Sequence, residues 1–354
     1  MKEYIVTKEI LNMRSEPSDE SDDTYVGKLL KGDRVWLEDG DIIGVVPKGG
    51  ESNIWKIKSG SVNVVAKDGV KQTFKWFNDL KIDTIWNTYN ESGTNAKVAV
   101  LDTGYNLNVV DLTLAVKESK PFIISASTGQ LVNIDDSFGH GSHCASLIGS
   151  RNTNLICGCG PAVNLYIAKI SSSGSVKDYS IIIEAIKWAI EKEVDIISIS
   201  YGGETNDPNL ENIVNTAVND HNILIVAAIG DVIPNSTNKP LYPALFNTCL
   251  AVGAVDENYS IDPVTILSEK IEIFAPGRNI TGYSTGSEPE IMTGTSQATA
   301  ILAGVCGLII SKYKSLHKKY TPASIKELLL QNFDLTTDGT NKKIISPSKI
   351  FSKM

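Results

Sequence analysis

The chain has 354 residues, of which 42% are hydrophobic and 21% are charged, and its formal net charge is −8. The composition is typical of a globular protein. The length predicts one large domain or two unequal domains. The negative net charge argues against a general nucleic-acid binder and against an anionic membrane surface as partner. No apolar run reaches the roughly 18 residues of a membrane helix, and the N-terminus has no apolar signal core.

The cysteines point to the compartment. There are five, scattered along the chain: Cys144, Cys157, Cys159, Cys249 and Cys306. An odd, scattered set suits a reducing compartment better than a disulfide framework, so we expect a cytoplasmic protein. The close pair Cys157 and Cys159 has no second pair to complete a metal site, which favours two small buried thiols over metal ligands.

Residues 1–72 are short β-type runs separated by turn residues, enough for a small barrel. The runs are Tyr4–Thr7, Arg34–Leu37, Asp41–Val46 and Ile54–Lys58.

Three segments of this region, Asn12–Ser18, Val26–Asp33 and Trp55–Ile57, follow the N-x-R-x-x-P turn, the KGD turn and the aromatic strand of a known module. They resemble the bacterial SH3-like module. The resemblance implies an N-terminal SH3-like β-barrel domain over 1–72, with a protein or intramolecular partner. A removable pro-region is the alternative.

From Phe74 onward, nearly all-apolar runs alternate with amphipathic helical stretches. Strands that are apolar on both faces imply a parallel sheet covered by helices, which predicts an α/β domain over 73–354. The strand-like runs are Val98–Leu101, Leu165–Ile170, Ile196–Ser200, Ile223–Ala228, Leu250–Val255 and Ile271–Phe274. The helix-like stretches are Ile181–Ile190, Leu210–Val218 and Ala323–Leu330, the last after Thr321 and Pro322.

A Gly-Thr-Ser turn precedes the apolar, Ala- and Gly-rich run Ala298–Ile310, which is long enough for a buried helix. Ser296 is thereby placed at a helix N-terminus, where free N–H groups and the helix dipole favour a developing negative charge. The serine is either a nucleophile, if a base and an orienting acid reach it, or only an N-cap.

Candidates for both partners lie upstream of Ser296. Asp102 follows the run Val98–Leu101, and catalytic groups of open α/β sheets lie at strand carboxyl ends; a turn or cap role is the alternative. His140 lies between two glycines, which let other groups approach its ring. His143 is one turn further on, so we expect a structural histidine there. A zinc site made by the two histidines lacks an evident third ligand.

Three motifs then agree with one family. The sets Asp102-Thr103-Gly104, His140-Gly141-Ser142-His143 and Gly294-Thr295-Ser296 resemble those of the subtilisin-like serine proteases. The order Asp, His, Ser is the family's order, and the separations of 38 and 156 residues are close to it. The resemblance covers about residues 76–335. It implies a subtilisin-like three-layer α/β/α fold with a mostly parallel sheet, and a serine endopeptidase that acts on polypeptides and requires no cofactor.

The resemblance also implies a mechanism. Ser296 attacks a peptide carbonyl and forms an acyl-enzyme, His140 transfers the proton, and Asp102 holds the His140 tautomer. Substrate is expected as an extra strand beside Ser173–Ser175 and Ser200–Gly202. The residues expected to border the specificity pocket are Ser200, Tyr201, Ala228 and Gly230, and Tyr179 resembles the aromatic residue of a more remote pocket.

One departure from the family bears on activity. Asp231 stands where the family has the Asn that donates to the oxyanion. An ionised carboxylate repels an oxyanion, whereas a protonated one can donate a hydrogen bond; Asn235 is an alternative donor. A second interpretation therefore stays open, a catalytically attenuated, subtilase-like peptide-binding or sensing module.

Two further features come from the resemblance. Cys144 follows His143, as in the thiol-containing branch of the family, which places the thiol behind His140. Calcium stabilises many members and prefers hard oxygen ligands. Asp111 and Asn152 match positions of its ligands in the family. A simple turn role for Asp111 is the alternative.

Overall fold

The computed structural model describes residues 74–354, except 126, 152–155, 175, 177, 287 and 288, together with the backbone of six strands between residues 2 and 66. The chain divides into two compact units, Met1–Val70 and Lys71–Met354. The sequence analysis had put the boundary between residues 72 and 73.

The first unit is built from antiparallel strands. A four-stranded sheet has the order β5-β4-β1-β6, and β2 pairs with β3. The strands are β1 (Lys2–Val6), β2 (Ile10–Arg14), β3 (Tyr25–Leu30), β4 (Arg34–Glu38), β5 (Asp41–Val46) and β6 (Val64–Ala66). The predicted run Tyr4–Thr7 overlaps β1 in its described part, Arg34–Leu37 lies within β4, and Asp41–Val46 is β5. The run Ile54–Lys58 lies outside the described residues, and the SH3-like barrel stays a prediction.

The second unit contains a sheet with nine strands in the described part of the chain, in the order β16-β17-β13-β12-β11-β10-β7-β9-β8. All its neighbours run parallel except β16 and β17, which confirms the predicted mostly parallel sheet. The strands are β7 (Lys97–Asp102), β8 (Val116–Pro121), β9 (Asn164–Lys169), β10 (Ile196–Ile199), β11 (Leu224–Ala228), β12 (Leu250–Val255), β13 (Ile273–Pro276), β16 (Phe333–Leu335) and β17 (Lys343–Ile345). The six predicted apolar runs are the six strands β7 and β9–β13.

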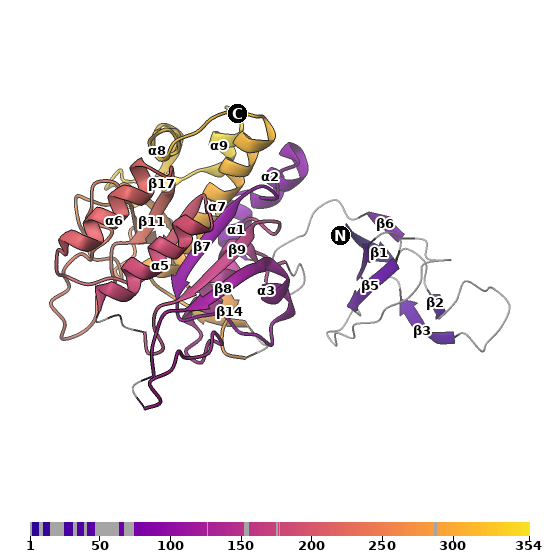
Figure 1. The fold of residues 1–354 in the computed structure, drawn as a ribbon. Coiled ribbons are helices and arrows are strands. Elements are labelled where there is room, and N and C mark those ends of the chain that lie inside the picture. The colour runs from indigo at the N-terminus through magenta and orange to yellow at the C-terminus, as the bar shows by residue number, and fades with distance from the viewer. Residues whose placement is uncertain are drawn as a thin grey trace. The chain divides into compact units, whose positions relative to one another are not determined.

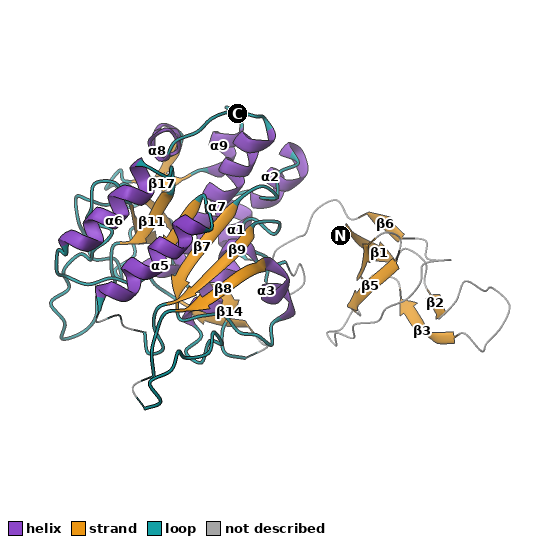
Figure 2. Cartoon of the chain, in the orientation of Figure 1, coloured by secondary structure: helices purple, strands orange, loops and turns teal. Residues whose placement is uncertain are grey.

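Helices cover both faces of this sheet (Figure 2). Those of the described residues are α1 (Lys75–Asp79), α2 (Ile82–Tyr89), α3 (Val110–Ala115), α4 (His140–Gly149), α5 (Tyr179–Glu191), α6 (Pro208–Asn219), α7 (Thr295–Ser315), α8 (Pro322–Gln331) and α9 (Pro347–Phe351). A separate antiparallel hairpin pairs β14 (Ile280–Tyr283) with β15 (Pro289–Met292). The sequence analysis did not predict this hairpin.

The three layers follow from the two-residue period of the strands. In β7, Val98 and Val100 pack into the core that contains α4 and α7, whereas Ala99 and Leu101 pack into the core that contains α5 and α6. Helices α5 and α6 lie side by side on their face of the sheet (Figure 1). Because both faces are covered, strands with apolar residues at every position are stable here.

Helix α7 is buried on all sides over its first four turns, from Thr295 to Ser311. By length and composition alone it is apolar enough to cross a membrane. Its most apolar window is 89% buried within the protein, however, as in the core helix of a globular domain, so this is weak evidence for a span. Polar residues, among them Ser296, Gln297 and Thr299, interrupt its apolar sequence, so it has no uninterrupted apolar run of membrane length.

Candidate active site

Three neighbouring parallel strands bring their carboxyl ends to one edge of the sheet. Strand β10 lies between β7 and β11. Asp102 is the last residue of β7, Ser200 follows β10, and Asp231 lies three residues beyond β11. Residues that are far apart in the sequence therefore meet at the edge where α/β proteins place their reacting groups.

Asp102 and His140 form a hydrogen-bonded pair at this edge. Oδ1 of Asp102 lies 2.8 Å from Nδ1 of His140. The side chains are 1% and 17% exposed, respectively, so the acid is buried and the base reaches the surface. Oδ1 also accepts from the backbone N–H of Thr103 at 2.7 Å. Because a carboxylate only accepts, Nδ1 carries the proton, and Nε2 is the basic nitrogen.

Close packing allows this pair to form. A Cβ on Gly141 would lie 2.3 Å from the carbonyl oxygen of Gly104, so only glycine lets α4 start this close to the end of β7. The backbone N–H of Gly141 donates to Oγ1 of Thr103 at 2.8 Å. The Asp and His motifs are thus joined at two adjacent points.

Asp136 fixes the start of α4, a role that the sequence analysis missed. Its Oδ2 accepts from the backbone N–H and the hydroxyl of Ser142, at 2.8 and 2.7 Å, and its Oδ1 accepts from the N–H of Gly139 at 2.8 Å. Burial raises the pKa of Asp136, but these hydrogen bonds outweigh burial and hold the pKa below its ordinary value. An Asp shortly before the glycine that opens the helix was the available signal.

The surroundings of His140 favour the imidazolium. Burial lowers the pKa of His140, but the negative charge and hydrogen bond of Asp102 outweigh it and raise the pKa well above its ordinary value. The imidazole ring also packs edge-on against Tyr201, with 5.2 Å between ring centroids. A base with a raised pKa accepts a proton readily once it is neutral.

Ser296 is the second residue of α7 and is 8% exposed. The N-cap is Gly294, without a side-chain cap, so the alternative role of Ser296 as N-cap does not hold. The thiol of Cys144 links this segment to the base: its Sγ lies 3.9 Å from Nδ1 of His140 and 4.0 Å from the carbonyl oxygen of Ser296. Ser200 contacts the same carbonyl through its hydroxyl, at 3.4 Å.

His143 faces away from this group, as predicted. It is fully buried, and its Nε2 lies 3.0 Å from the carbonyl oxygen of Ile280, to which it donates. Its Nδ1 lies 3.5 Å from the amide nitrogen of Gln297, the residue after Ser296. Burial lowers the pKa of His143 to about 4, so it is neutral at ordinary pH. His143 is therefore a structural link between α4 and α7.

Comparison with known proteins decides the family. The Subtilase family profile matches residues 93–346. The chain belongs to the subtilase family. It is 32% identical to Subtilisin NAT of Bacillus subtilis subsp. natto over 239 residues, which are 67% of this chain and 60% of that protein.

Two other relatives are covered more fully. Subtilisin of Bacillus pumilus is 32% identical over 239 residues, 67% of this chain and 83% of that protein. The Major intracellular serine protease of Bacillus subtilis (strain 168) is 34% identical over 258 residues, 71% of this chain and 80% of that protein. This chain therefore spans about 60% of the length of Subtilisin NAT, and most of the length of the other two.

Within this subtilase fold, Asp231 contacts the start of α7. Its Oδ1 accepts from the backbone N–H and the hydroxyl of Thr295, at 2.8 and 2.6 Å. A carboxylate from the segment after β11 thus caps the helix that carries Ser296. Oδ2 lies against Gly294, where a Cβ would be 2.4 Å away. Burial raises the pKa of Asp231, and the two bonds from Thr295 only partly offset this. Asn235, the alternative donor, is exposed.

The predicted pocket residues lie around the same edge. Ser200, Tyr201 and Gly202 are half-buried and follow β10, whereas Ala228 and Gly230 are buried at the end of β11. Gly230 has a φ of 114°, which favours glycine. The predicted substrate strand Ser173–Ser175 is described only in part, because Ser175 lies outside the described residues.

Tyr179 lines a wide surface pocket of about 560 Å³, together with Gly203 and the acidic side chains of Asp178, Glu204 and Asp207. Gly203 directly follows the predicted substrate segment Ser200–Gly202 in the chain. Two of the acids also cap helices: Asp178 accepts from Ser180 at α5, and Asp207 from Asn209 at α6.

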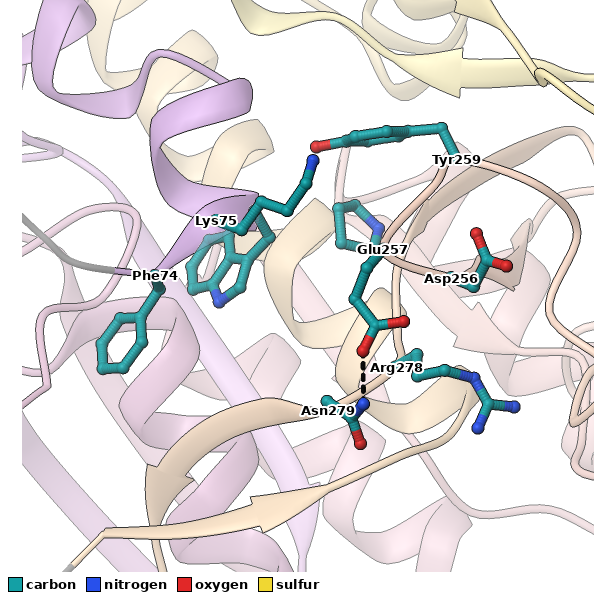
Figure 3. A pocket seen from close by; sticks show the side chains of 9 residues that line it. Phe74, Lys75, Asp256, Glu257, Tyr259, Arg278 and Asn279 are labelled. Carbon is teal, nitrogen blue, oxygen red and sulfur yellow. Dashed lines mark hydrogen bonds between the residues drawn. The ribbon is translucent and has the colours of Figure 1, made fainter.

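A second, smaller pocket of about 70 Å³ lies beyond the carboxyl ends of β12 and β13 (Figure 3). Lys75 extends over the ring of Tyr259, 5.0 Å from its centroid, and Asn279 donates to Glu257. None of the predicted catalytic residues lines this pocket. It does not belong to the site of Asp102, His140 and Ser296.

The calcium prediction has little support from the described residues. Oδ2 of Asp111 accepts from the hydroxyl of Tyr283 at 2.9 Å, and Asn152 lies outside the described residues. Among the described residues, Asp111 belongs to no cluster of three His, Cys, Asp or Glu ligand groups. The Asp111 and Asn152 site therefore stays a prediction.

Proposed function

We propose that this subtilase is a serine endopeptidase that hydrolyses polypeptides through an acyl-enzyme, with Ser296, His140 and Asp102 as its triad. The observation that carries the proposal is the hydrogen bond between the buried Asp102 and the partly exposed His140, with the thiol of Cys144 in contact with both the imidazole and the Ser296 backbone. A serine at the start of a buried helix supplies the nucleophile, and the two partners supply base and orientation.

In the proposed reaction, the hydroxyl of Ser296 attacks the peptide carbonyl while Nε2 of His140 takes its proton. The same proton then goes to the leaving amine, and water hydrolyses the ester by the reverse path. Asp102 keeps the proton on Nδ1 and stabilises the imidazolium. Substrate lies beside Ser200–Gly202, bordered by Tyr201, Ala228 and Gly230, and reaches the pocket of Tyr179.

Fluorophosphonate labelling tests the proposed nucleophile. A fluorophosphonate probe phosphonylates a serine only where a neighbouring base activates its hydroxyl. We expect one adduct, on the peptide that contains Ser296, in the full-length protein at neutral or alkaline pH, together with casein cleavage. Labelling that is absent at every pH between 5 and 9 would rule out the endopeptidase.

Asp231 favours a second candidate function, an attenuated peptide-binding or sensing module. A carboxylate near the oxyanion helps only when it is protonated, and Oδ2 is the oxygen left for that proton because Oδ1 accepts both bonds from Thr295. Turnover then needs Asp231 protonated and His140 neutral at the same time. The pKa of His140 is raised well above 6.5, and that of Asp231 is raised from 3.8.

The two raised pKa values determine the shape of the pH profile of kcat/KM. While the pKa of Asp231 is below that of His140, the single proton that the two groups hold between these pKa values is mostly on His140. The reactive form, in which the proton is on Asp231 and His140 is neutral, is the minor species. Its population is low and constant between the two pKa values. It falls below the pKa of Asp231 because His140 stays charged, and above the pKa of His140 because Asp231 loses its proton.

The Asp231→Asn variant separates the candidates. An amide donates at every pH, so we expect kcat/KM to rise with pH to a plateau above the pKa of His140, instead of declining there. The gain at alkaline pH is expected to reach about 10²–10³-fold, the size associated with this donor in subtilisin, a member of the same family. The measurement is kcat/KM on a peptide substrate from pH 5 to pH 10.

Asn235→Asp serves as the control, because its side chain is exposed, and it should leave the profile unchanged. A loss of activity in Asp231→Asn at all pH values would mean that the carboxylate has a role of its own. No turnover in either protein, with peptide binding retained, would favour the sensing module.

Location and the N-terminal unit complete the proposal. All five cysteines are buried, and each lies in the described part of the chain, which suits a reducing, cytoplasmic setting. One relative is named an intracellular protease. The antiparallel strands of residues 2–66 are compatible with an SH3-like module that binds a protein or intramolecular partner.

A further inference from the structure

One buried nucleophilic group at the site has no role in the proposed reaction. Cys144 is fully buried on α4, one turn after His140, so the two side chains are i,i+4 neighbours on one helix face. The zinc site considered from the sequence paired His140 with His143, which instead donates to Ile280. The residue that the fold does place beside His140 is Cys144.

Asp102, His140 and Cys144 form a set of potential metal ligands. One ligand atom from each lies within 4.8 Å of the others. Nδ1 of His140 is 2.8 Å from Oδ1 of Asp102 and 3.9 Å from Sγ of Cys144. Nitrogen, oxygen and sulfur ligands of a tetrahedral zinc ion are separated by roughly 3.3–3.6 Å. Zinc geometry would need Nδ1 to move about half an ångström away from Oδ1 and a few tenths of an ångström towards Sγ, and the carboxylate oxygen and Sγ to come from at most 4.8 Å into the same range.

A second observation points to a ligand at this place. Oδ2 of Asp102 is buried and has no hydrogen-bond partner among the described residues, although Asp102 is fully buried. A buried carboxylate oxygen without a partner is uncommon because it pays a desolvation penalty. A cation bound between Asp102 and Cys144 would satisfy it. The hydroxyl of Ser200, 3.8 Å from Sγ of Cys144, is a further neighbour of this place.

We propose that Asp102, His140 and Cys144 form an inhibitory site for zinc. On binding, the Nδ1 proton of His140 moves to Nε2 if the ring is neutral, or leaves to solvent if the ring is an imidazolium with Nε2 already protonated. The thiol proton of Cys144 leaves to solvent, and the ion takes Nδ1, the thiolate and a carboxylate oxygen. A His140 ring with its proton on Nε2 cannot take the proton of Ser296, so turnover stops. The inhibition rests on the proposed function, whereas the binding of the ion does not.

Burial and ligand type set the selectivity of the site. Burial raises the pKa of the Cys144 thiol, so the thiol is neutral until a metal displaces its proton. Thiolate and imidazole prefer zinc and cobalt, whereas calcium and magnesium prefer oxygen ligands alone. Hard cations should therefore not compete for the site.

The first experiment reads binding without catalysis. Full-length Ser296→Ala protein is titrated with Co²⁺, whose thiolate complexes show a charge-transfer band in the near ultraviolet. We expect the band in Ser296→Ala and its loss in Ser296→Ala/Cys144→Ala. Ser296→Ala/Cys249→Ala, which removes a buried thiol elsewhere, should keep it. A missing band, or a band that survives removal of Cys144, would overturn the site.

The second experiment reads inhibition. Zinc should inhibit peptide cleavage by the wild-type protein, and Cys144→Ala should raise the zinc concentration for half inhibition by roughly ten-fold or more. Cys144→Ser preserves side-chain size if the alanine variant folds poorly. Equal inhibition of wild type and both variants would contradict the proposal. Cobalt binding in a protein that never cleaves peptides would leave the metal site standing and refute the endopeptidase.

Discussion

Replacing Ser296 by alanine is expected to lower kcat/KM on a peptide substrate by about 10⁶-fold, as removal of the corresponding serine does in subtilisin, a member of the same family. The change removes the proposed nucleophile and leaves the rest of the site in place. Ser296 is not the N-cap of α7, and Asp231 caps that helix through Thr295. The helix should therefore keep its stability, and only the reaction is lost. The measurement is steady-state hydrolysis by the purified full-length protein.

The matched control is Ser315→Ala, at the exposed end of the same helix, where the hydroxyl donates to the carbonyl of Lys312. It should keep wild-type kcat/KM. The thermal midpoint of Ser296→Ala should also stay close to that of the wild type, which separates a chemical loss from a folding loss. If Ser296→Ala retained more than a few per cent of the activity, another residue would have to be the nucleophile.

Replacing Asp102 by asparagine is expected to lower kcat by about 10⁴-fold at neutral pH. Asparagine keeps the shape of the side chain, but its amide can donate to Nδ1 of His140 and so stabilise the tautomer with the proton on Nε2. That tautomer cannot take the proton of Ser296. Loss of the negative charge also changes the pKa of His140. Because Asp102 raises that pKa, the variant should have a lower His140 pKa. The measurement is the pH dependence of kcat.

The control for charge alone is Asp220→Asn, an exposed carboxylate, which should change neither kcat nor the profile. The pKa of His140, followed by NMR of the ring protons, provides a readout independent of activity. An Asp102→Asn variant whose His140 pKa did not fall would contradict the assigned ion pair, whatever its rate.

Much of the fold was predictable because each segment carries its own signal. The strands of the central sheet are apolar at every position, and only a covered parallel sheet suits such runs. Helix α8 was predicted from Thr321 and Pro322, and the structure has the capping box between Thr321 and Ser324. The β14–β15 hairpin and the edge strand β8 were not predicted, because short strands of mixed polarity have no clear period.

Some residues of the candidate site were likewise predictable from the sequence, and others were not. Asp102, His140 and Ser296 were identifiable because each lies in a short motif, and their order matched one family. Asp136 carried only the local signal of an Asp ahead of a helix, and its role depends on the positions of the N–H groups of Gly139 and Ser142 around it. Asp231 was noticed as an unexpected residue, but its contact with Thr295, 64 residues away, is a product of the fold.

The sequence by itself determined the class of fold, the three motifs and the family to which they belong, since these depend on local pattern and order. Only the tertiary structure decided which groups touch. It set the expected Cys144 thiol at 3.9 Å from Nδ1 of His140, made Asp231 the cap of the helix that carries Ser296, and left one oxygen of Asp102 without a partner in the described chain. The reason is physical: these contacts join residues from different strands and helices, and their distances depend on close packing, which no single segment encodes.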